Sequence, residues 1–337
     1  MGASGMFLWM GFIICTGVIL YSGTKLSKYA DILAEKTGLG RTFVGFVFLA
    51  AATSLPELIN GISSVAVVGV PDIAVGDIFG SCAFNVLIIA FMDAFSRPQP
   101  VFFSARPGHV ISASFGILLL SLGAGAVFLS GRLPSIGWVG PYSVVFVVVY
   151  AVAMRLVRHY EKRALEEFHK EVAEEPAYAG IDSRTAYRNF ALNAALVVAA
   201  AVVLPKVGEG LAESTGLGQT FVGTIFIALT TSLPELVVSV ATVKMGAVDL
   251  AIGNVFGSNI FNILVLAVDD LFFLRGPLFS YTDPHHIVPA LSAVAMSSVA
   301  VIGLSYRARK KKFFIAWDSL AIMGLFALNV LMLYILR

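Results

Sequence analysis

Ten long apolar segments constrain this chain of 337 residues more than any other feature of its sequence. Most reach the roughly 20 apolar residues that an α-helix needs to cross a bilayer. Charged residues make up only 13%, against roughly 25% in soluble domains. We therefore predict an all-α membrane protein, and the composition excludes a nucleic-acid binder, a disordered chain and an ordinary soluble enzyme. The predicted spans are 6–24, 41–67, 72–94, 107–130, 136–158, 188–207, 219–244, 248–273, 285–305 and 313–336.

The distribution of basic residues predicts how these spans are oriented, because cytoplasmic loops carry an excess of Lys and Arg. With ten spans and the 160–187 loop in the cytoplasm, most of the 23 Lys and Arg residues lie on the cytoplasmic side. The exceptions are Arg132, Lys206, Arg275 and Arg337. This asymmetry predicts that both termini lie outside the cell.

The two halves of the chain repeat one another. Residues 42–57 read TFVGFVFLAAATSLPE and residues 220–235 read TFVGTIFIALTTSLPE. Downstream, GDIFGSCAFN at 76–85 aligns with GNVFGSNIFN at 253–262. Each half holds five spans, an odd number, so the second half enters the membrane the opposite way up. The sequence thus predicts an inverted repeat, which is common in secondary transporters with a binding site at the repeat interface.

The repeats also divide the chain into units. We predict a first five-helix repeat at 1–158, which contains the motif region 42–94. A second five-helix repeat at 188–337 contains the motif region 220–272. Between them, the cytoplasmic linker 159–187 mixes acidic and basic residues, which favours a short solvated helix and a connection.

Two glutamates lie well inside apolar spans, at equivalent positions of the repeat. A charge at mid-bilayer costs roughly 2.5–3.5 kcal/mol on insertion scales, so Glu57 and Glu235 favour a functional role over a packing role. Each follows a proline, Pro56 or Pro234, which lacks an N–H and breaks or kinks the helix. Carbonyl groups freed at this depth are tolerated only against protein or along a cavity. We therefore predict broken helices whose freed groups converge with the two carboxylates.

Further oxygen donors recur beside these breaks. Hydroxyls precede each proline, and one span later each repeat presents a serine and an asparagine four residues apart, on one helix face. These side chains belong to Thr53, Ser54, Thr231, Ser232, Ser81, Asn85, Ser258 and Asn262. Hard oxygen ligands suit Ca²⁺ or Na⁺, whereas zinc prefers nitrogen and sulfur. For the Ser/Asn motif, close helix packing is an alternative interpretation, and both can hold together.

Other acidic residues give weaker signals. Asp77 lies one turn before Ser81 on the same helix face, and its repeat partner is Asn254. A role for Asp77 at an ion entrance is therefore left open. An interfacial position is expected for three acids near span ends: Asp93, Asp269 and Asp270.

The doubled motif resembles the cation/calcium exchanger superfamily, and within it the sodium/calcium exchangers of prokaryotes. Thr-Ser-Leu-Pro-Glu and Gly-Ser-x-x-Phe-Asn, each present twice, are similar to the two alpha-repeats of that family. The resemblance implies that Glu57 and Glu235 bind Ca²⁺ and Na⁺ competitively, and that the first span of each half slides to open the site alternately. It also implies ligands from the hydroxyls named above, from Asn85 and Asn262 at the centre, and from the carbonyls of Ala50 and Ala228.

The predicted function is therefore Na⁺/Ca²⁺ antiport in a prokaryotic cell membrane. The chain is expected to be no enzyme and to need no cofactor, no nucleic acid and no obligatory protein partner beyond its ions and the bilayer. H⁺/Ca²⁺ antiport is the main alternative, because buried carboxylates can exchange protons. Transport of another divalent cation, a channel, and a hydrolase built on Ser54 or Ser232 remain open. The hydrolase is disfavoured, since none of the five histidines lies deep beside those serines.

Overall fold

The computed structural model describes residues 3–96, 98–132, 134–171, 178, 180–215, 229, 231–311 and 315–336. In these ranges the chain forms helices joined by turns and short loops, with one isolated bridge between Ile136 and Val139. Nine of the described helical segments are long and apolar enough to cross a membrane. The tenth predicted span, 219–244, falls largely outside the described residues, and α11 (Leu233–Lys244) is its described part.

The helices follow the predicted spans in order. Those of the first half are α1 (Ala3–Thr37), a broken segment at 41–68, α5 (Pro71–Phe95), the short α6 (Val101–Ser104), α7 (His109–Phe128) and α8 (Pro141–Glu171). Those of the second half are α9 (Ser183–Thr215), α11, α12 (Val248–Phe272), α13 (Ile287–Tyr306) and α14 (Trp317–Ile335), with the 3-10 turns Leu278–Tyr281 and Pro284–His286 before α13. Three helices, α1, α8 and α9, run several residues beyond the predicted spans. Hydropathy marks only the apolar part of a helix, so their polar extensions were not predicted.

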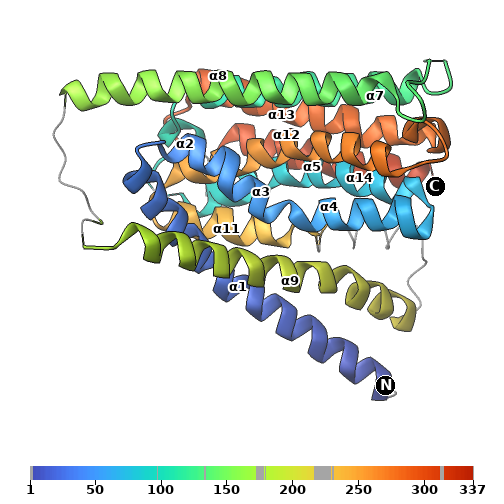
Figure 1. The fold of residues 1–337 in the computed structure, drawn as a ribbon. Helices are drawn as coiled ribbons and strands as arrows, with labels where there is room; N and C mark the ends of the chain where they lie inside the picture. Colours follow the sequence, from blue (N-terminus) through green and yellow to red (C-terminus); the bar gives the residue numbers. More distant parts are fainter. Residues whose placement is uncertain are drawn as a thin grey trace.

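The centre of the bundle is formed by α5 and α12, which pack against each other and are mostly buried (Figure 1). By contrast, only 22% of the residues in the most apolar stretches of α1, α9 and α14 are buried, as lipid-facing helices require. Gly253 and Gly257 of α12 lie directly against the backbone at Thr42 and Phe46. A Cβ at either glycine would meet that backbone, so the small residues of this motif do serve close helix packing.

Two helices that are far apart in the sequence form a separate layer. In Figure 1, α1 and α9 lie side by side and cross one face of the bundle obliquely. Besides each other, α1 packs on α11, and α9 packs on α4 (Leu55–Ile62). One hydrogen bond of this layer runs from Ser27 Oγ to the Val238 carbonyl of α11, at 3.0 Å. These are the helices that open each half of the chain.

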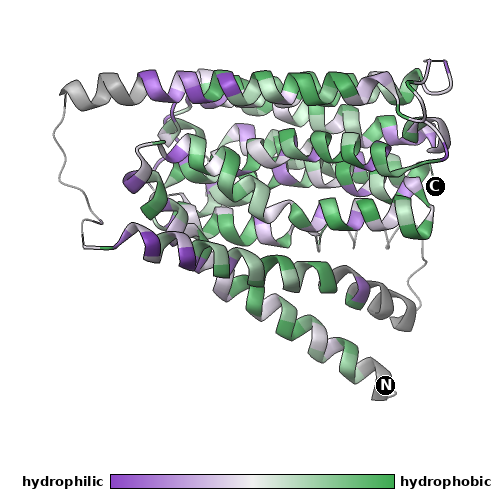
Figure 2. Ribbon diagram, in the orientation of Figure 1, coloured by the Kyte–Doolittle hydropathy of each residue, from purple (hydrophilic) through white to green (hydrophobic). Residues whose placement is uncertain are grey.

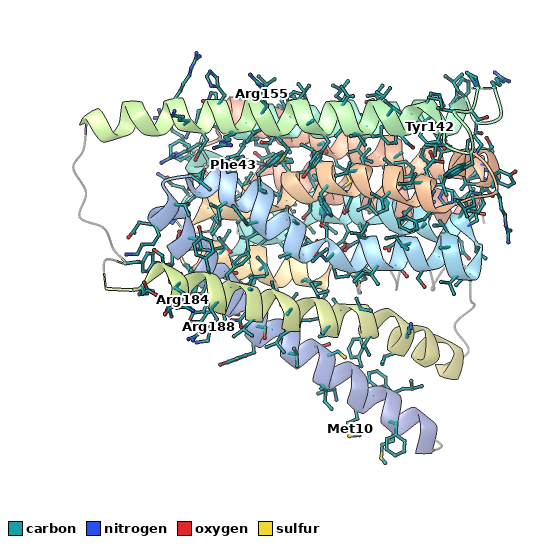
Figure 3. The ribbon with its side chains drawn as sticks, viewed as in Figure 1. Met10, Phe43, Tyr142, Arg155, Arg184 and Arg188 are labelled. Carbon is teal, nitrogen blue, oxygen red and sulfur yellow. The ribbon has the colours of Figure 1, made fainter. Side chains whose placement is uncertain are left out.

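The two ends of the bundle differ in polarity. Both termini lie at one end, and the end of α8 and the start of α9 lie at the other, here called the α8–α9 end (Figure 1). Apolar residues cover the middle of the bundle, while hydrophilic residues gather toward the α8–α9 end (Figure 2). The labelled Arg184 and Arg188 of α9 lie at this end, with Tyr142 at the opposite end (Figure 3). An apolar belt with polar ends is the arrangement expected of a protein that spans a bilayer.

The three acids expected at the interface lie at helix ends, yet all are fully buried inside the protein. Asp93 and Asp270, at equivalent repeat positions, each accept hydrogen bonds from two backbone N–H groups. The donors are Val101 and Ala316 for Asp93, and Gly140 and Leu278 for Asp270. A buried carboxylate that organises loops in this way is structural. Asp269 has no hydrogen-bond partner among the described residues.

The region between the two repeats is partly helical. The helix α8 continues through the first part of the predicted linker 159–187, and α9 begins before that linker ends. The division of the chain at this linker stays a prediction.

Candidate functional site

The helix breaks lie at the predicted prolines. The segment 41–68 consists of α2 (Arg41–Val44), a π-helical turn Gly45–Leu49, α3 (Ala50–Thr53), α4 (Leu55–Ile62) and a second π-helical turn Ser63–Val68. Ser54 leaves the helical conformation at φ −94° and ψ 7°, and Ser232 does so at φ −84° and ψ 5°. Pro56 and Pro234 stand in the first turn of the helix that follows each break, where a missing N–H is tolerated.

Each glutamate is paired with the break serine of the opposite repeat. Ser54 Oγ donates to Glu235 Oε1 at 3.0 Å. Ser232 Oγ lies 3.5 Å from Glu57 Oε1, at the limit of a hydrogen bond. All four residues are fully buried. The two helix breaks therefore face one another at the interface between the repeats.

The central helices complete this network, again across the repeat interface. Ser232 Oγ also lies 3.0 Å from Ser81 Oγ of α5. Thr53 Oγ1 donates to Asn254 Oδ1 of α12 at 3.3 Å, and Thr231 Oγ1 donates to Asp77 Oδ1 of α5 at 3.0 Å. Each break is thus held by the central helix of the other half.

Several buried polar atoms at this interface have no hydrogen-bond partner among the described residues. They are Glu57 Oε2, Glu235 Oε2, Ser258 Oγ and the amide atoms of Asn85 and Asn262. An unpaired buried polar group costs roughly 1–3 kcal/mol, so such atoms are normally satisfied by protein, water or an ion. Their oxygens are ligands suited to Na⁺ or Ca²⁺.

No positively charged side chain is paired with either glutamate in the described parts of the chain. The ion pairs found there lie toward the helix ends, such as Arg41 with Asp31 at 2.5 Å and Lys311 with Asp93 at 3.1 Å. Nor do three acidic, histidine or cysteine side chains gather there as a metal centre. A cation bound here would therefore take most of its ligands from hydroxyl, amide and carbonyl oxygens.

Of the two backbone carbonyl ligands that the resemblance implies, only one lies in the part of the chain that the structure describes. Ala50 is buried in α3, and its carbonyl already accepts a hydrogen bond from the Ser54 N–H at 2.9 Å. The same carbonyl lies 3.4 Å from Thr53 Oγ1, so a cation bound there would replace this long contact. Ala228 lies outside the described residues.

Two residues of the network were not among the predicted ligands. Asn254 and Asp77, at equivalent positions, accept the threonine hydroxyls described above, and Asn60 Nδ2 donates to Asp77 Oδ2 at 2.7 Å. The signal for Asp77 was its place one turn before Ser81. Asn60 has no repeat counterpart of similar chemistry, since the repeat alignment pairs it with Val238.

The family model described as sodium/calcium exchanger protein matches this chain twice, over residues 7–157 and 187–335. The chain belongs to this family. It is therefore a membrane transporter of cations and no enzyme, and the double match confirms the two repeats.

Curated relatives and solved structures agree with this assignment. The inner membrane protein YrbG of Escherichia coli K12 is 30% identical over 252 residues, 74% of each chain. The sodium/calcium exchanger MaX1 of Methanosarcina acetivorans is 24% identical over 341 residues, 91% of this chain and 93% of that one. A structure of the sodium-calcium exchanger NCX_Mj, soaked with 2.5 mM Na⁺ and 0.1 mM Ca²⁺, matches with TM-score 0.73 over 98% of each chain. At 19% identity this likeness shows the fold.

Proposed function

We infer that this protein exchanges Na⁺ for Ca²⁺ across a prokaryotic cell membrane, at one site shared by the two repeats. The observation that carries this inference is the reciprocal pairing of Ser54 with Glu235 and of Ser232 with Glu57. It brings two carboxylates of opposite repeats to one buried place and leaves one oxygen of each without a partner. A cation that binds both glutamates is held at the symmetry centre of an inverted repeat, where transporters bind their substrates.

The charges of the site favour Ca²⁺ and Na⁺ as competitors. Two glutamates balance one Ca²⁺, and its six to eight oxygen ligands can be drawn from the surrounding hydroxyls, amides and carbonyls. Several Na⁺ ions can replace it, because the same hard oxygens serve both ions. A site with few charges and many neutral ligands also binds weakly enough to release its ion, as transport requires. The remaining ligands in this proposal are Thr53, Thr231, Ser81, Ser258, Asn85, Asn262, Ala50 and Ala228.

Alternating access is assigned to α1 and α9. These helices pack on each other and lie against α11 and α4, the elements that follow the two breaks. Only 22% of the residues in the most apolar stretch of each helix are buried, which leaves those stretches free to move along the core. Na⁺ binding on one side and Ca²⁺ binding on the other then drive the helices between two positions.

The orientation follows from the basic residues. We place the end that carries Arg184 and Arg188 in the cytoplasm, according to the positive-inside rule. Both termini, which lie at the opposite end, are then outside. The names of two relatives support the proposed membrane location and the proposed exchange, one as an inner membrane protein and one as a sodium/calcium exchanger.

Radioactive calcium uptake into proteoliposomes tests the proposed exchange. Vesicles loaded with Na⁺ are diluted into Na⁺-free buffer, and a parallel set carries a proton gradient without Na⁺. Uptake that requires internal Na⁺ supports Na⁺/Ca²⁺ exchange. Uptake driven by the proton gradient alone would replace it by H⁺/Ca²⁺ antiport at the same glutamates, and Ca²⁺ leak without any counter-ion would indicate a channel.

A further inference from the structure

Asp77 breaks the symmetry of the site. It occupies on α5 the place that Asn254 occupies on α12, and each accepts a hydrogen bond from the threonine of the opposite repeat. The two oxygen-to-oxygen distances are similar, 3.0 Å from Thr231 and 3.3 Å from Thr53. The two positions thus differ mainly by one negative charge, which the first repeat has and the second lacks.

The surroundings of Asp77 contain hydrogen-bond donors but no paired cation. Its side chain is buried, with Asn60 Nδ2 2.7 Å from Oδ2, and with the hydroxyls of Thr231 and Ser81 3.0 and 3.4 Å from Oδ1. None of the ion pairs found in the described ranges includes Asp77. A buried carboxylate is costly unless it is hydrogen-bonded and its charge is balanced. The donors meet the first requirement, and a cation from solution meets the second.

Asp77 is also continuous with the glutamate site. Ser81 Oγ lies 3.0 Å from Ser232 Oγ, which in turn lies 3.5 Å from Glu57 Oε1. Two hydroxyl groups therefore separate the Asp77 carboxylate from the Glu57 carboxylate. A small cation that enters beside Asp77 Oδ1 meets the Thr231 and Ser81 hydroxyls, which both lie within hydrogen-bonding distance of that oxygen.

We propose that Asp77 is a third cation-binding carboxylate, which binds one Na⁺ together with the hydroxyls of Thr231 and Ser81. This inference rests on the proposed exchange function and extends its site. Because the two glutamates already balance one Ca²⁺, Asp77 acts on the Na⁺-loaded form and little on Ca²⁺ binding.

The test uses Asp77→Asn, which gives the first repeat the residue of the second and keeps the size of the side chain. Proteoliposomes loaded with Ca²⁺ take up radioactive Ca²⁺ by Ca²⁺/Ca²⁺ exchange, while external Na⁺ is raised to inhibit it. Ca²⁺/Ca²⁺ exchange without Na⁺ is measured first for each variant, and Na⁺ inhibition is expressed relative to it. We expect the Na⁺ concentration for half inhibition to rise at least about tenfold, and the inhibition curve to become less steep by about one Na⁺.

A matched control separates direct binding from a general effect of charge. Asp269 is another fully buried acid, and its carboxylate lies against Gly61, the neighbour of Asn60, without a hydrogen bond to Asp77. Because the Asp269 charge acts on Asp77 only through space, Asp269→Asn should change Na⁺ inhibition less than Asp77→Asn does. If Asp269→Asn weakens Na⁺ inhibition as much as Asp77→Asn does, the charge of Asp77 acts at a distance and not as a ligand, and the proposal fails.

The other outcomes are equally decisive. Unchanged Na⁺ inhibition in Asp77→Asn overturns the proposal, whether or not the pH dependence of exchange is altered. An equal weakening of Na⁺ inhibition and of Ca²⁺/Ca²⁺ exchange also overturns it. If that variant does not fold, Asn254→Asp supplies the test, because a fourth carboxylate at the equivalent position should lower the Na⁺ concentration for half inhibition. Wild-type exchange that ignores Na⁺ refutes the proposed function itself, which is a distinct result.

Discussion

The contact between α12 and the first broken helix fixes the site, because Gly257 immediately precedes Ser258 and faces α3. A Cβ added at Gly257 would lie 2.8 Å from Ala50 Cβ and would collide with the carbonyl of Phe46. Carbon atoms in ordinary contact are roughly 3.5–4.0 Å apart. In Gly257→Ala the two helices must therefore separate by about 1 Å.

Such a separation acts on stability and on transport. Extra atoms in a well-packed core cost about 1–3 kcal/mol. A displacement of about 1 Å in a site that positions its ligands can cost about a hundredfold in rate. We therefore expect Gly257→Ala to lower Na⁺-driven Ca²⁺ uptake between about tenfold and a hundredfold, with a measurable loss of thermal stability in detergent.

The measurement compares initial rates of radioactive Ca²⁺ uptake in proteoliposomes of equal protein content. Gly324→Ala is the matched control, since Gly324 lies in α14 and a Cβ there meets nothing within 4 Å. That variant should transport at the wild-type rate. Wild-type transport and thermal stability in Gly257→Ala would refute the packing argument.

Three further substitutions test individual parts of the site. Glu57→Gln should abolish Ca²⁺ uptake in proteoliposomes while leaving the protein folded, and full activity would reject the site. The control is Glu161→Gln, which should keep transport, because Glu161 is paired with Arg106 at 3.7 Å and lies outside the site. Ser54→Ala removes the 3.0 Å hydrogen bond to Glu235, so equilibrium Ca²⁺ binding should weaken about tenfold or more. An unchanged Ca²⁺ affinity would show that this hydrogen bond does not contribute to binding. Asp270→Asn should lower the thermal stability in detergent, because a carboxylate that accepts several hydrogen bonds is replaced, but the Na⁺ dependence of any folded protein should not change.

The sequence was sufficient for the architecture because strong local rules determine it. Apolar length fixes a span, an odd number of spans inverts a repeat, and a proline such as Pro56 breaks a helix wherever it lies in the interior. Each of these rules acts within one segment. The positions of Glu57 and Glu235 in the fold followed from them without any knowledge of the packing.

The pairings within the site could not be predicted, because they depend on how the two halves are docked. Nothing in the motif Ser-Leu-Pro-Glu states that Ser54 contacts the glutamate of the other repeat. Nor does hydropathy reveal that Asp93 is buried by loops that fold back over it. Asp77 lies between these cases, since its helix face was predicted but its threonine partner was not.

The reciprocal bonds also bear on which part of the protein moves. Relative movement of the two repeats would break the bonds of Ser54 and Ser232 together. In the described residues, α1 is joined to the core by the Ser27–Val238 bond and by the Asp31–Arg41 ion pair. If α1 slides, a covalent link between α1 and α11 must stop transport. Gly23 offers the place, because a Cβ there would lie 3.7 Å from Val237 Cβ, within the roughly 3.5–4.5 Å that a disulfide requires.

In the double variant Gly23→Cys and Val237→Cys, oxidation should therefore abolish Na⁺-driven Ca²⁺ uptake, and reduction should restore it. The single variants, treated with the same oxidant, control for the native thiols Cys15 and Cys82, both of which are buried. Cross-linking is measured as the loss of free thiols in the same vesicles. If fully cross-linked protein still transports, α1 does not slide past α11, and the moving element must be sought in the core itself.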